Sequence, residues 1–471
     1  MPSAYASPEK TSDRILSRSL QATRRSVFWL ESGAPEPQPP LSGDCEADLL
    51  VIGGGYTGLW TALIAKERDP SASVVLVESH EVGWAASGRN GGFCEADLTH
   101  GEENGRRHFT KELPLLHRLG AENFEAIADA ITRYGIDAEF ERTGMLQVAT
   151  EEYQVDGLRD LAALEGEVLL GRDEVQDRVN SPLYRGGVHL REGIALVHPA
   201  KLAWGLRRAC LDLGVEIAEG SPALSMRRRG TRIVVATPTG TVSALRVGVA
   251  TNAFPSLVKR ANRYVVPVYD YALVTERLSS RQLAAIGWAE RFGIADSSRQ
   301  FHYYRLTADN RILFGGYDAI YHRGGTIRPE HDDRPATFRK LADHFFRTFP
   351  QLQDVDFSHA WGGAIDMSTK LVAHTGTAYA GQVAYTAGFT GLGVGATRFG
   401  ASVMLDVLSG SDTELTRLSM VRTKPFPIPP EPIAYPAIQM TRAAVARSDE
   451  REGRDGPLLK LMSAMRIGFD T

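Results

Sequence analysis

Residues 51–60 read VIGGGYTGLW, and the glycines at Gly53, Gly55 and Gly58 have the G-x-G-x-x-G spacing of a dinucleotide-binding turn. The spacing alone is weak evidence, since the 46 glycines among 471 residues produce about 0.4 such matches by chance. The context is stronger. An apolar run, residues 49–52, comes directly before the turn, as in a parallel strand buried on both faces, and a helical pattern begins at Leu59.

A second buried strand, residues 73–78, follows the helix and ends at Glu78. Glu78 lies about 20 residues after Gly58, where dinucleotide-binding folds carry the acidic residue that binds a ribose. We expect Gly53 to permit the tight turn, Gly55 to let a pyrophosphate approach, and Gly58 to let helix pack on strand. Glu78 would repel a ribose phosphate, so the pattern argues against an NADP-type ligand. The order of the elements argues against a glycine turn that binds nothing.

The composition excludes several classes of protein. With 43% hydrophobic residues, 23% charged residues and a formal net charge of −4, the chain is expected to be globular and to bind no nucleic acid. Cys45, Cys94 and Cys210 lie too far apart for a metal-binding pair, so we expect no metal and a reducing compartment. No uncharged apolar run of about 18 residues occurs, and the arginines at 24–25 precede no apolar export segment. We therefore expect a cytoplasmic protein without a membrane partner.

Helical and β-rich segments alternate along the rest of the chain. Period-two alternation in the predicted strand 301–306 puts His302 and Tyr304 on one face, and Tyr303 and Arg305 on the other. The other predicted elements are helical character over 106–150 up to a strand at 145–148, helices at 200–213 and 396–408, a hairpin of 233–236 with 242–249, and strands at 311–317 and 383–388.

Several separated motifs make a more specific argument together than the first turn makes alone. They are Val51–Gly58 with Glu78, Gly83–Gly92, Ala250–Ala253, Tyr304–Arg311, Trp361–Gly363 and Gly388–Val394. In this order they resemble the FAD-dependent D-amino acid oxidase and glycine oxidase superfamily, and most of all its gamma-glutamylputrescine oxidase-like branch. The resemblance covers roughly residues 46–412.

The resemblance implies an α/β fold with a Rossmann-like FAD-binding domain assembled from discontinuous segments. It also implies an α+β substrate domain with a mixed or antiparallel sheet. The expected division is an N-terminal extension at 1–45, an FAD-binding domain at 46–110, 190–262 and 355–412, a substrate domain at 111–189 and 263–354, and a C-terminal arm at 413–471.

The resemblance also implies which residues bind the cofactor. The loop Gly83–Gly92 would lie along the diphosphate and the flavin edge, and Gly391–Gly393 would aim a helix N-terminus at the pyrimidine end of the flavin. Reduction leaves negative charge there, and helix N–H groups stabilise it. The expected FAD contacts are Gly53, Gly55, Tyr56, Thr57, Gly58, Glu78, Ser79, Trp84, Ala85, Ser87, Gly88, Arg89, Asn90, Gly91, Gly92, Ala223, Thr251, Asn252, Phe389, Thr390, Gly391, Leu392, Gly393 and Val394.

The chain departs from many relatives in two places. Leu392 stands between the last two glycines, where many relatives carry a polar residue, and no lysine occurs in the strand 312–317, where some oxidases carry one over the flavin. The segment between Trp361 and Gly393, where flavinylated relatives place a cysteine, has none. We therefore expect FAD to be held without a covalent bond.

The expected activity is oxidation of a C–N bond in an amine or amino acid. Hydride passes to flavin N5, the imine is hydrolysed, and oxygen reoxidises the flavin and yields hydrogen peroxide. Candidate catalytic residues are His302, Tyr304, Arg305 and Trp361. Each has a structural alternative, since a histidine or tyrosine in a sheet often serves packing, and Arg305 could form an internal salt bridge instead of binding a carboxylate. Two other functions stay open, a dehydrogenase with another electron acceptor and a non-catalytic flavoprotein.

Overall fold

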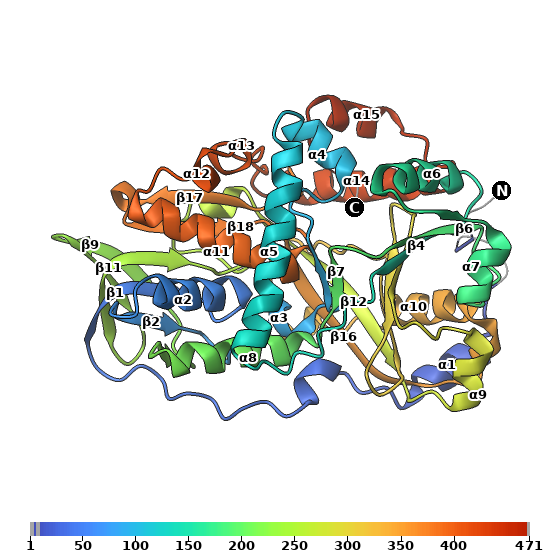
Figure 1. Ribbon diagram of the computed structural model, residues 1–471, viewed down its shortest axis with the longest axis horizontal. Helices are drawn as coiled ribbons and strands as arrows, with labels where there is room; N and C mark the ends of the chain where they lie inside the picture. Colours follow the sequence, from blue (N-terminus) through green and yellow to red (C-terminus); the bar gives the residue numbers. More distant parts are fainter. Residues whose placement is uncertain (1–3, 6–9, 469–471) are drawn as a thin grey trace.

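The computed structural model describes residues 4–5 and 10–468, which form two lobes, each built around one large sheet (Figure 1). The first lobe contains the glycine turn of residues 53–58. The strands of its sheet, in spatial order, are β17 (His374–Ala378), β18 (Val383–Ala387), β11 (Thr241–Val249), β1 (Cys45–Ile52), β2 (Val74–Val77) and β8 (Glu216–Ala218), with β10 (Arg232–Ala236) and β9 (Ser225–Arg229) added beside β11.

The central strands of this first sheet run parallel, from β18 through β11, β1 and β2 to β8. Leu50 and Val51 in β1 are fully buried, as the continuous apolar run predicts, because Val51 packs under helices and Leu50 packs on the other face against β10. The covering helices α2 (Tyr56–Arg68), α8 (Pro199–Asp212) and α11 (Gly393–Ser409) pack on one another, and α5 (Leu113–Arg133) packs on α11. Figure 1 shows α5 crossing the front of the molecule beside this lobe.

The second lobe is built on a mixed sheet that is mostly antiparallel. One face of this sheet packs on α10 (Pro335–Thr348) through Phe338, Leu341 and Phe345, in a core that contains many aromatic side chains. Its strands, in spatial order, are β16 (Phe357–Met367), β12 (Val266–Thr275), β15 (Ile312–Gly316), β14 (His302–Leu306), β13 (Gly293–Asp296), β4 (Met145–Ala149), β6 (Gly186–Leu190) and β5 (Leu169–Leu170).

Shorter elements join and flank the lobes. β3 (Phe93–Glu95) and β7 (Ile194–Leu196) pair as a small antiparallel sheet directly after the loop Gly83–Gly92. The others are α3 (Ala86–Arg89), α4 (Glu102–Phe109), α6 (Gln154–Glu165), α7 (Arg172–Arg178), α9 (Ser280–Ile286), α12 (Glu414–Arg417), α13 (Ser419–Arg422), α14 (Ala434–Asp449) and α15 (Pro457–Ala464).

The structure confirms the predicted fold class and most of the individual strands and helices, although the helical stretch predicted over 106–150 ends at Arg133. Two segments fall outside the expected division. β16 lies in the range assigned to the FAD-binding domain, yet it pairs with β12 in the second sheet, from Val266↔Met367 to Thr275↔Phe357. α5 lies in the range assigned to the substrate domain, yet its apolar stripe, including Phe124 and Ile127, packs into the core of the first lobe. In both cases tertiary packing decides, and local periodicity does not show the partner.

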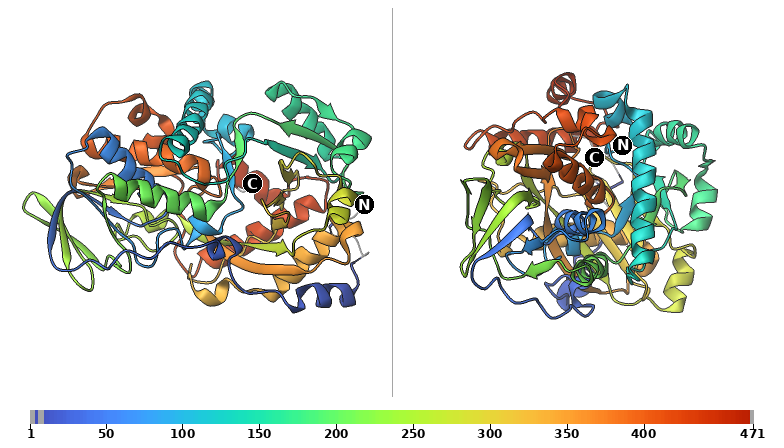
Figure 2. Two further views of the ribbon diagram at one scale, coloured as in Figure 1. Left: turned by 60° about the horizontal axis from the view of Figure 1, so that its bottom comes forward. Right: turned by 60° about the vertical axis from the view of Figure 1, so that its left-hand side comes forward.

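The N-terminal extension contains folded elements that pack on the rest of the protein. Its α1 (Asp13–Gln21) packs on α10, and the 3₁₀ turn η1 (Phe28–Glu31) lies beneath the loop Gly83–Gly92. The chain then runs along one edge of the molecule to the first lobe (Figures 1 and 2). Residues 1–3 and 6–9 of this extension, and 469–471 of the C-terminal arm, lie outside the described residues.

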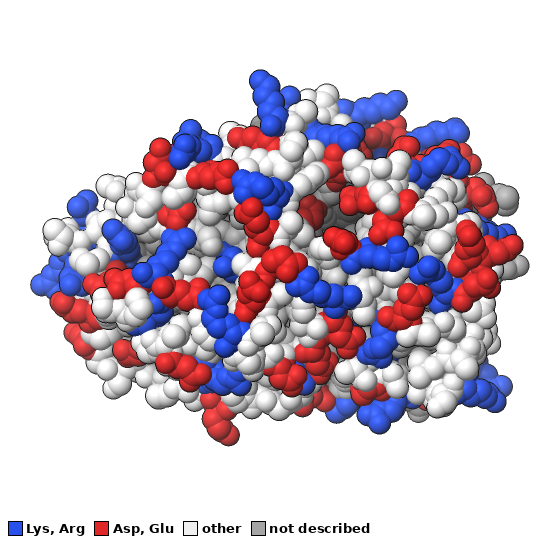
Figure 3. Space-filling view, in the orientation of Figure 1, with Lys and Arg blue, Asp and Glu red and all other residues white. Residues whose placement is uncertain are grey.

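The surface carries both signs of charge. Figure 3 shows basic and acidic side chains interspersed over the visible face, without a large region of one sign. Within residues 10–468, no helix has the length and apolar character needed to cross a membrane.

Candidate active site

The first glycine turn is fixed by close backbone contacts at two of its three positions. A Cβ on Gly53, where φ is +111°, would lie 2.4 Å from the Ala250 carbonyl oxygen, and one on Gly58 would lie 1.9 Å from that of Gly53. These positions therefore exclude any side chain. A Cβ on Gly55 would meet only Ser87 Oγ, at 3.0 Å. The first and third glycines thus serve the fold, and the second leaves the backbone open beside the loop Gly83–Gly92, as a pyrophosphate requires.

The N-terminus of α2 has the free donors that an anion needs. Its N-cap, Gly55, has no side chain to accept from the first turn, and Tyr56 N donates to Ser87 Oγ at 2.9 Å. The N–H groups of Thr57 and Gly58 follow in the same turn. Helix N-termini with uncapped N–H groups bind phosphates, so this turn fits the diphosphate of FAD. Thr251 and Asn252, next to the Ala250 carbonyl that contacts the turn, complete this side.

Glu78 directly follows β2 and accepts hydrogen bonds from several donors. Its Oε2 accepts from Gly54 N at 2.6 Å, and its Oε1 accepts from Trp84 Nε1 at 3.0 Å and from Ser79 Oγ at 2.9 Å. Ser221 N donates to the Glu78 carbonyl at 2.6 Å, so the segment that leads to Ala223 lies alongside. The Ser79 hydroxyl can rotate away from Glu78, so the hydroxyl groups of a ribose could take its place as donors. The Glu78 carboxylate is therefore a suitable ribose acceptor.

The loop Gly83–Gly92 is clamped between the lobes by two tryptophans. Trp361 Nε1 donates to the Arg89 carbonyl and Trp29 Nε1 to the Asn90 carbonyl, each at 2.9 Å. Arg89 itself bonds to Asp332 and, at 3.2 Å, to the Gly362 carbonyl. Inside the loop, Asn90 Oδ1 accepts from Gly92 N at 2.8 Å. The loop is therefore fixed from the N-terminal extension on one side and from β16 on the other.

The last glycine turn is held by a buried carboxylate. Gly388 N and Phe389 N donate to Asp366 at 2.6 and 3.2 Å, and burial raises the pKa of the Asp366 carboxyl to about 7. A Cβ on Gly391 would meet nothing within 4 Å, and α11 begins at Gly393 without a side-chain cap. The turn therefore presents open space and free N–H groups, as the pyrimidine end of a flavin requires.

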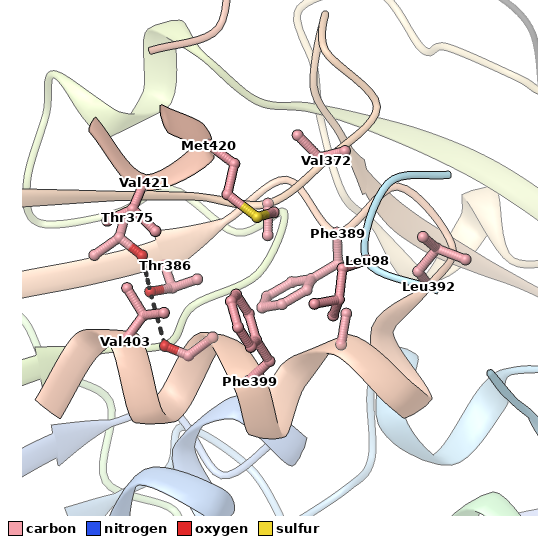
Figure 4. Close-up of a pocket in the computed structure, with 13 residues that line it drawn as sticks. Leu98, Val372, Thr375, Thr386, Phe389, Leu392, Phe399, Val403, Met420 and Val421 are labelled. Carbon is pink, nitrogen blue, oxygen red and sulfur yellow. Dashed lines mark hydrogen bonds between the residues drawn. The ribbon is translucent and has the colours of Figure 1, made fainter. Parts of the chain in front are cut away.

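An apolar cavity of about 20 Å³ lies behind this turn (Figure 4). Phe389 and Phe399 point into it, and Thr375 Oγ1 and Thr386 Oγ1 lie 2.9 Å apart at its far side. The volume suffices for about one water molecule. The Phe389 side chain thus packs behind the turn, so of this residue only the backbone fits the expected FAD contact.

The structure places His302 and Tyr304 on the face of β14 that packs on α10, away from the loop Gly83–Gly92. Both side chains are fully buried. His302 Nδ1 bonds to Asp296 at 2.7 Å and its Nε2 to His344 at 2.9 Å, while the Tyr304 hydroxyl bonds to that of Tyr184 at 2.7 Å. With these polar atoms occupied inside the aromatic core, neither residue contacts the candidate site. His302 and Tyr304 were expected to touch the substrate, but the structure gives both of them a packing role in the core.

Arg305 and Trp361 reach the site but act on its framework. Arg305 is 1% exposed and donates to the carbonyls of Gly92 and Val197 at 3.3 and 2.7 Å. It lies over the Trp29 ring, with 5.6 Å from guanidinium carbon to ring centroid. Burial lowers the pKa of its guanidinium to about 10. Its donors thus hold the flavin loop, which differs from both predicted roles, a carboxylate anchor and an internal salt bridge.

Two features of the site were not singled out from the sequence. Trp29, in the N-terminal extension, supports the loop, and only the short apolar run at 27–30 could have drawn attention to it. Asp270 in β12 bonds to Tyr303 in β14 on the face that looks toward the loop. The alternation in β14 separates Tyr303 from His302, but the sequence does not show which face meets the cofactor.

Comparison with known proteins agrees with this geometry. The family described as FAD dependent oxidoreductase matches residues 48–406, and the chain belongs to this family. The resemblance inferred from the sequence is thus confirmed, as is an FAD-dependent oxidoreductase activity. The glycine turns fit FAD because their backbone leaves no room for side chains at Gly53 and Gly58, their helices begin with uncapped N–H groups, and the space beside Gly391 is open.

The relatives span nearly the whole protein. A gamma-glutamylputrescine oxidoreductase of Escherichia coli is 30% identical over 415 residues, covering 85% of this chain and 93% of its own length. A probable oxidoreductase OrdL of Haemophilus influenzae is 28% identical over 419 residues, covering 85% and 92%. Among solved structures, glycine oxidase from Geobacillus kaustophilus is similar with a TM-score of 0.65 and 18% identity, covering 80% of this chain and 99% of its own. The last likeness shows the fold.

Proposed function

We propose that this protein oxidises a C–N single bond of an amine or amino acid and passes the electrons to oxygen. The observation that carries the proposal is the position of the loop Gly83–Gly92, which bonds to the first glycine turn through Ser87 and lies against Tyr303 of the second sheet at Gly91. Asp270 and Tyr303 retain exposed surface there. The names of relatives, such as gamma-glutamylputrescine oxidoreductase and sarcosine oxidase subunit beta, support a nitrogen-bearing substrate.

Bound FAD supplies the two-electron acceptor that this oxidation needs. The amine loses two electrons and two protons as its C–N bond becomes C=N, and water converts the imine to a carbonyl compound and an amine or ammonia. Oxygen takes up the two electrons and two protons as hydrogen peroxide. The protein's tasks are to orient the amine and to exclude bulk water during the oxidation.

We propose that FAD is bound without a covalent link. The chain from Trp361 to Gly393 has no cysteine, and Cys94, just past the flavin loop, is fully buried with a pKa that burial raises to about 12, so it is not a ready nucleophile. Acid precipitation should release all the yellow colour into the supernatant. Flavin retained on the washed precipitate would show a covalent link.

An anaerobic reduction screen tests the activity. Purified holoenzyme is mixed with a panel of amines and amino acids without oxygen, and the flavin absorbance is followed before and after air is admitted. We expect bleaching with at least one substrate and rapid return of colour in air. Slow return would indicate a dehydrogenase that uses another acceptor. Absence of bleaching across a broad panel would overturn the proposed oxidation and support a non-catalytic flavoprotein.

A further inference from the structure

A carboxylate and a phenol form a pair on the face of the second sheet that looks toward the flavin loop. The Tyr303 hydroxyl donates to Asp270 Oδ2 at 2.5 Å across the intervening strand β15. A Cβ on Gly91 would lie 2.6 Å from the Tyr303 ring. Asp270 in β12 lies opposite Gly363 of the neighbouring strand β16, and a Cβ on Gly363 would lie 3.6 Å from the Cβ of Arg89. The pair therefore lies directly against the loop Gly83–Gly92.

The pair is not fully covered by protein. Asp270 and Tyr303 are only half-buried although they lie between the lobes, and β16 changes from buried to half-buried at Gly363–Ile365 as it passes them. Glycine occupies position 315 in β15, where a Cβ would lie 2.7 Å from the Tyr303 hydroxyl. The Tyr303 ring therefore lies over Gly315, and the pair stays partly exposed beside the half-buried part of β16.

The charge that this face offers to a ligand is negative. Burial raises the pKa of the Asp270 carboxyl to about 6, while the hydrogen bond from Tyr303 lowers it, so the group is ionised above neutral pH. Arg305 donates to the Gly92 and Val197 carbonyls, and Arg89 bonds to Asp332 and to backbone carbonyls. Arg89 in the loop and Arg305 beside it therefore donate to protein acceptors, and an entering carboxylate would meet Asp270.

We propose that Asp270, oriented by Tyr303, binds the ammonium group of the substrate, so that the substrate class is amines without a carboxylate on the reacting carbon. An ammonium ion gains a charge-assisted hydrogen bond to Asp270 in a partly desolvated site. An α-amino acid places its carboxylate next to the same carbon and is repelled. This inference rests on the proposed function and narrows its substrate.

Ligand binding to the holoenzyme tests the assignment independently of turnover. Anaerobic isothermal titration calorimetry at pH 8 compares n-propylammonium chloride with sodium propionate, which carry equal chains and opposite charges. We expect the native protein to bind propylammonium at least tenfold more tightly than propionate. Asp270→Asn should weaken propylammonium binding at least tenfold with unchanged FAD absorbance. Glu276→Gln, which removes a 60% exposed carboxylate just after the same strand, should bind as the native protein does.

The assignment is overturned if native holoenzyme binds propionate as tightly as propylammonium, or binds neither probe. It is also overturned if Asp270→Asn keeps the native affinity. The comparison of the two probes on native protein needs no variant, so it holds even if Asp270→Asn fails to fold. Bleaching of the flavin by α-amino acids alone would sink this assignment and leave the proposed oxidation intact, whereas no bleaching at all would sink the oxidation.

Discussion

The two faces of β14 carry similar side chains in different surroundings. On the face toward α10, His302 and Tyr304 are fully buried, and their polar atoms are bonded to other buried side chains. On the face toward the flavin loop, Tyr303 is half-buried and bonds to Asp270, which also keeps exposed surface. A histidine or tyrosine in this strand is therefore structural or functional according to its face and its unused hydrogen-bonding capacity.

The largest expected difference between the faces concerns stability. His302→Ala removes the side chain that bonds to Asp296, which is 1% exposed. Breaking a buried pair in this way costs about 3 to 5 kcal/mol in free energy of unfolding. Urea unfolding at a fixed FAD concentration measures the loss. His117→Ala, at a site where the histidine side chain is 54% exposed, is the control and should change stability by less than about 0.5 kcal/mol.

A substitution at the expected ribose site, Glu78, should weaken FAD binding without changing either face of β14. Glu78→Ala removes a charged acceptor for the FAD ribose, a loss on the order of 1.5 to 3 kcal/mol in FAD binding. FAD retained after dialysis, measured by absorbance, should fall, whereas Glu216→Ala, at an exposed position at the start of the neighbouring β8, should retain FAD as the native protein does. Equal retention in the Glu78 variant would show that the ribose lies elsewhere.

Matched tyrosine variants on the two faces of β14 should differ by smaller effects. Tyr304→Phe should cost about 1 kcal/mol in stability, because the Tyr184 hydroxyl loses a buried partner. Tyr303→Phe should instead shift ligand binding. Its hydroxyl lowers the pKa of Asp270, so its removal raises that pKa. Propylammonium binding, which needs the ionised carboxylate, falls as pH drops through about 6 in the native protein and should fall at a higher pH in Tyr303→Phe. If the pH midpoint of propylammonium binding were the same in Tyr303→Phe as in the native protein, a role for Tyr303 would be contradicted.

Much of the fold follows from local patterns in the sequence. The apolar run ending at Ile52, the glycine spacing and the strand that ends at Glu78 predict the first βαβ unit, and the helical character within 106–150 predicts α5. The partner of each element does not follow. β16 joins the second sheet and α5 packs on the first lobe, because pairing depends on contacts between distant segments that periodicity does not encode.

The sequence predicted the glycine turns of the candidate site, but it did not predict which side chains of the second sheet lie beside them. Gly53 and Gly58 show their role through spacing, since the backbone contacts that exclude a Cβ recur wherever this turn binds a dinucleotide. The alternation of His302, Tyr303 and Tyr304 fixes two faces without telling which one meets the loop. Trp29 and Asp270 lie far from the motifs in sequence and reach the site only through tertiary structure.

We propose that oxidation takes place on the Asp270 face of the second sheet and needs no base from the His302 face. Anaerobic reduction of the flavin by saturating amine, measured by stopped flow across pH, tests it in His302→Gln with FAD bound. We expect a limiting reduction rate within about threefold of the native rate, less than 1 kcal/mol in activation free energy, because His302 bonds only within the core. Loss of nearly all reduction at every pH, in a folded variant that retains FAD, would contradict the claim and identify His302 as the catalytic base.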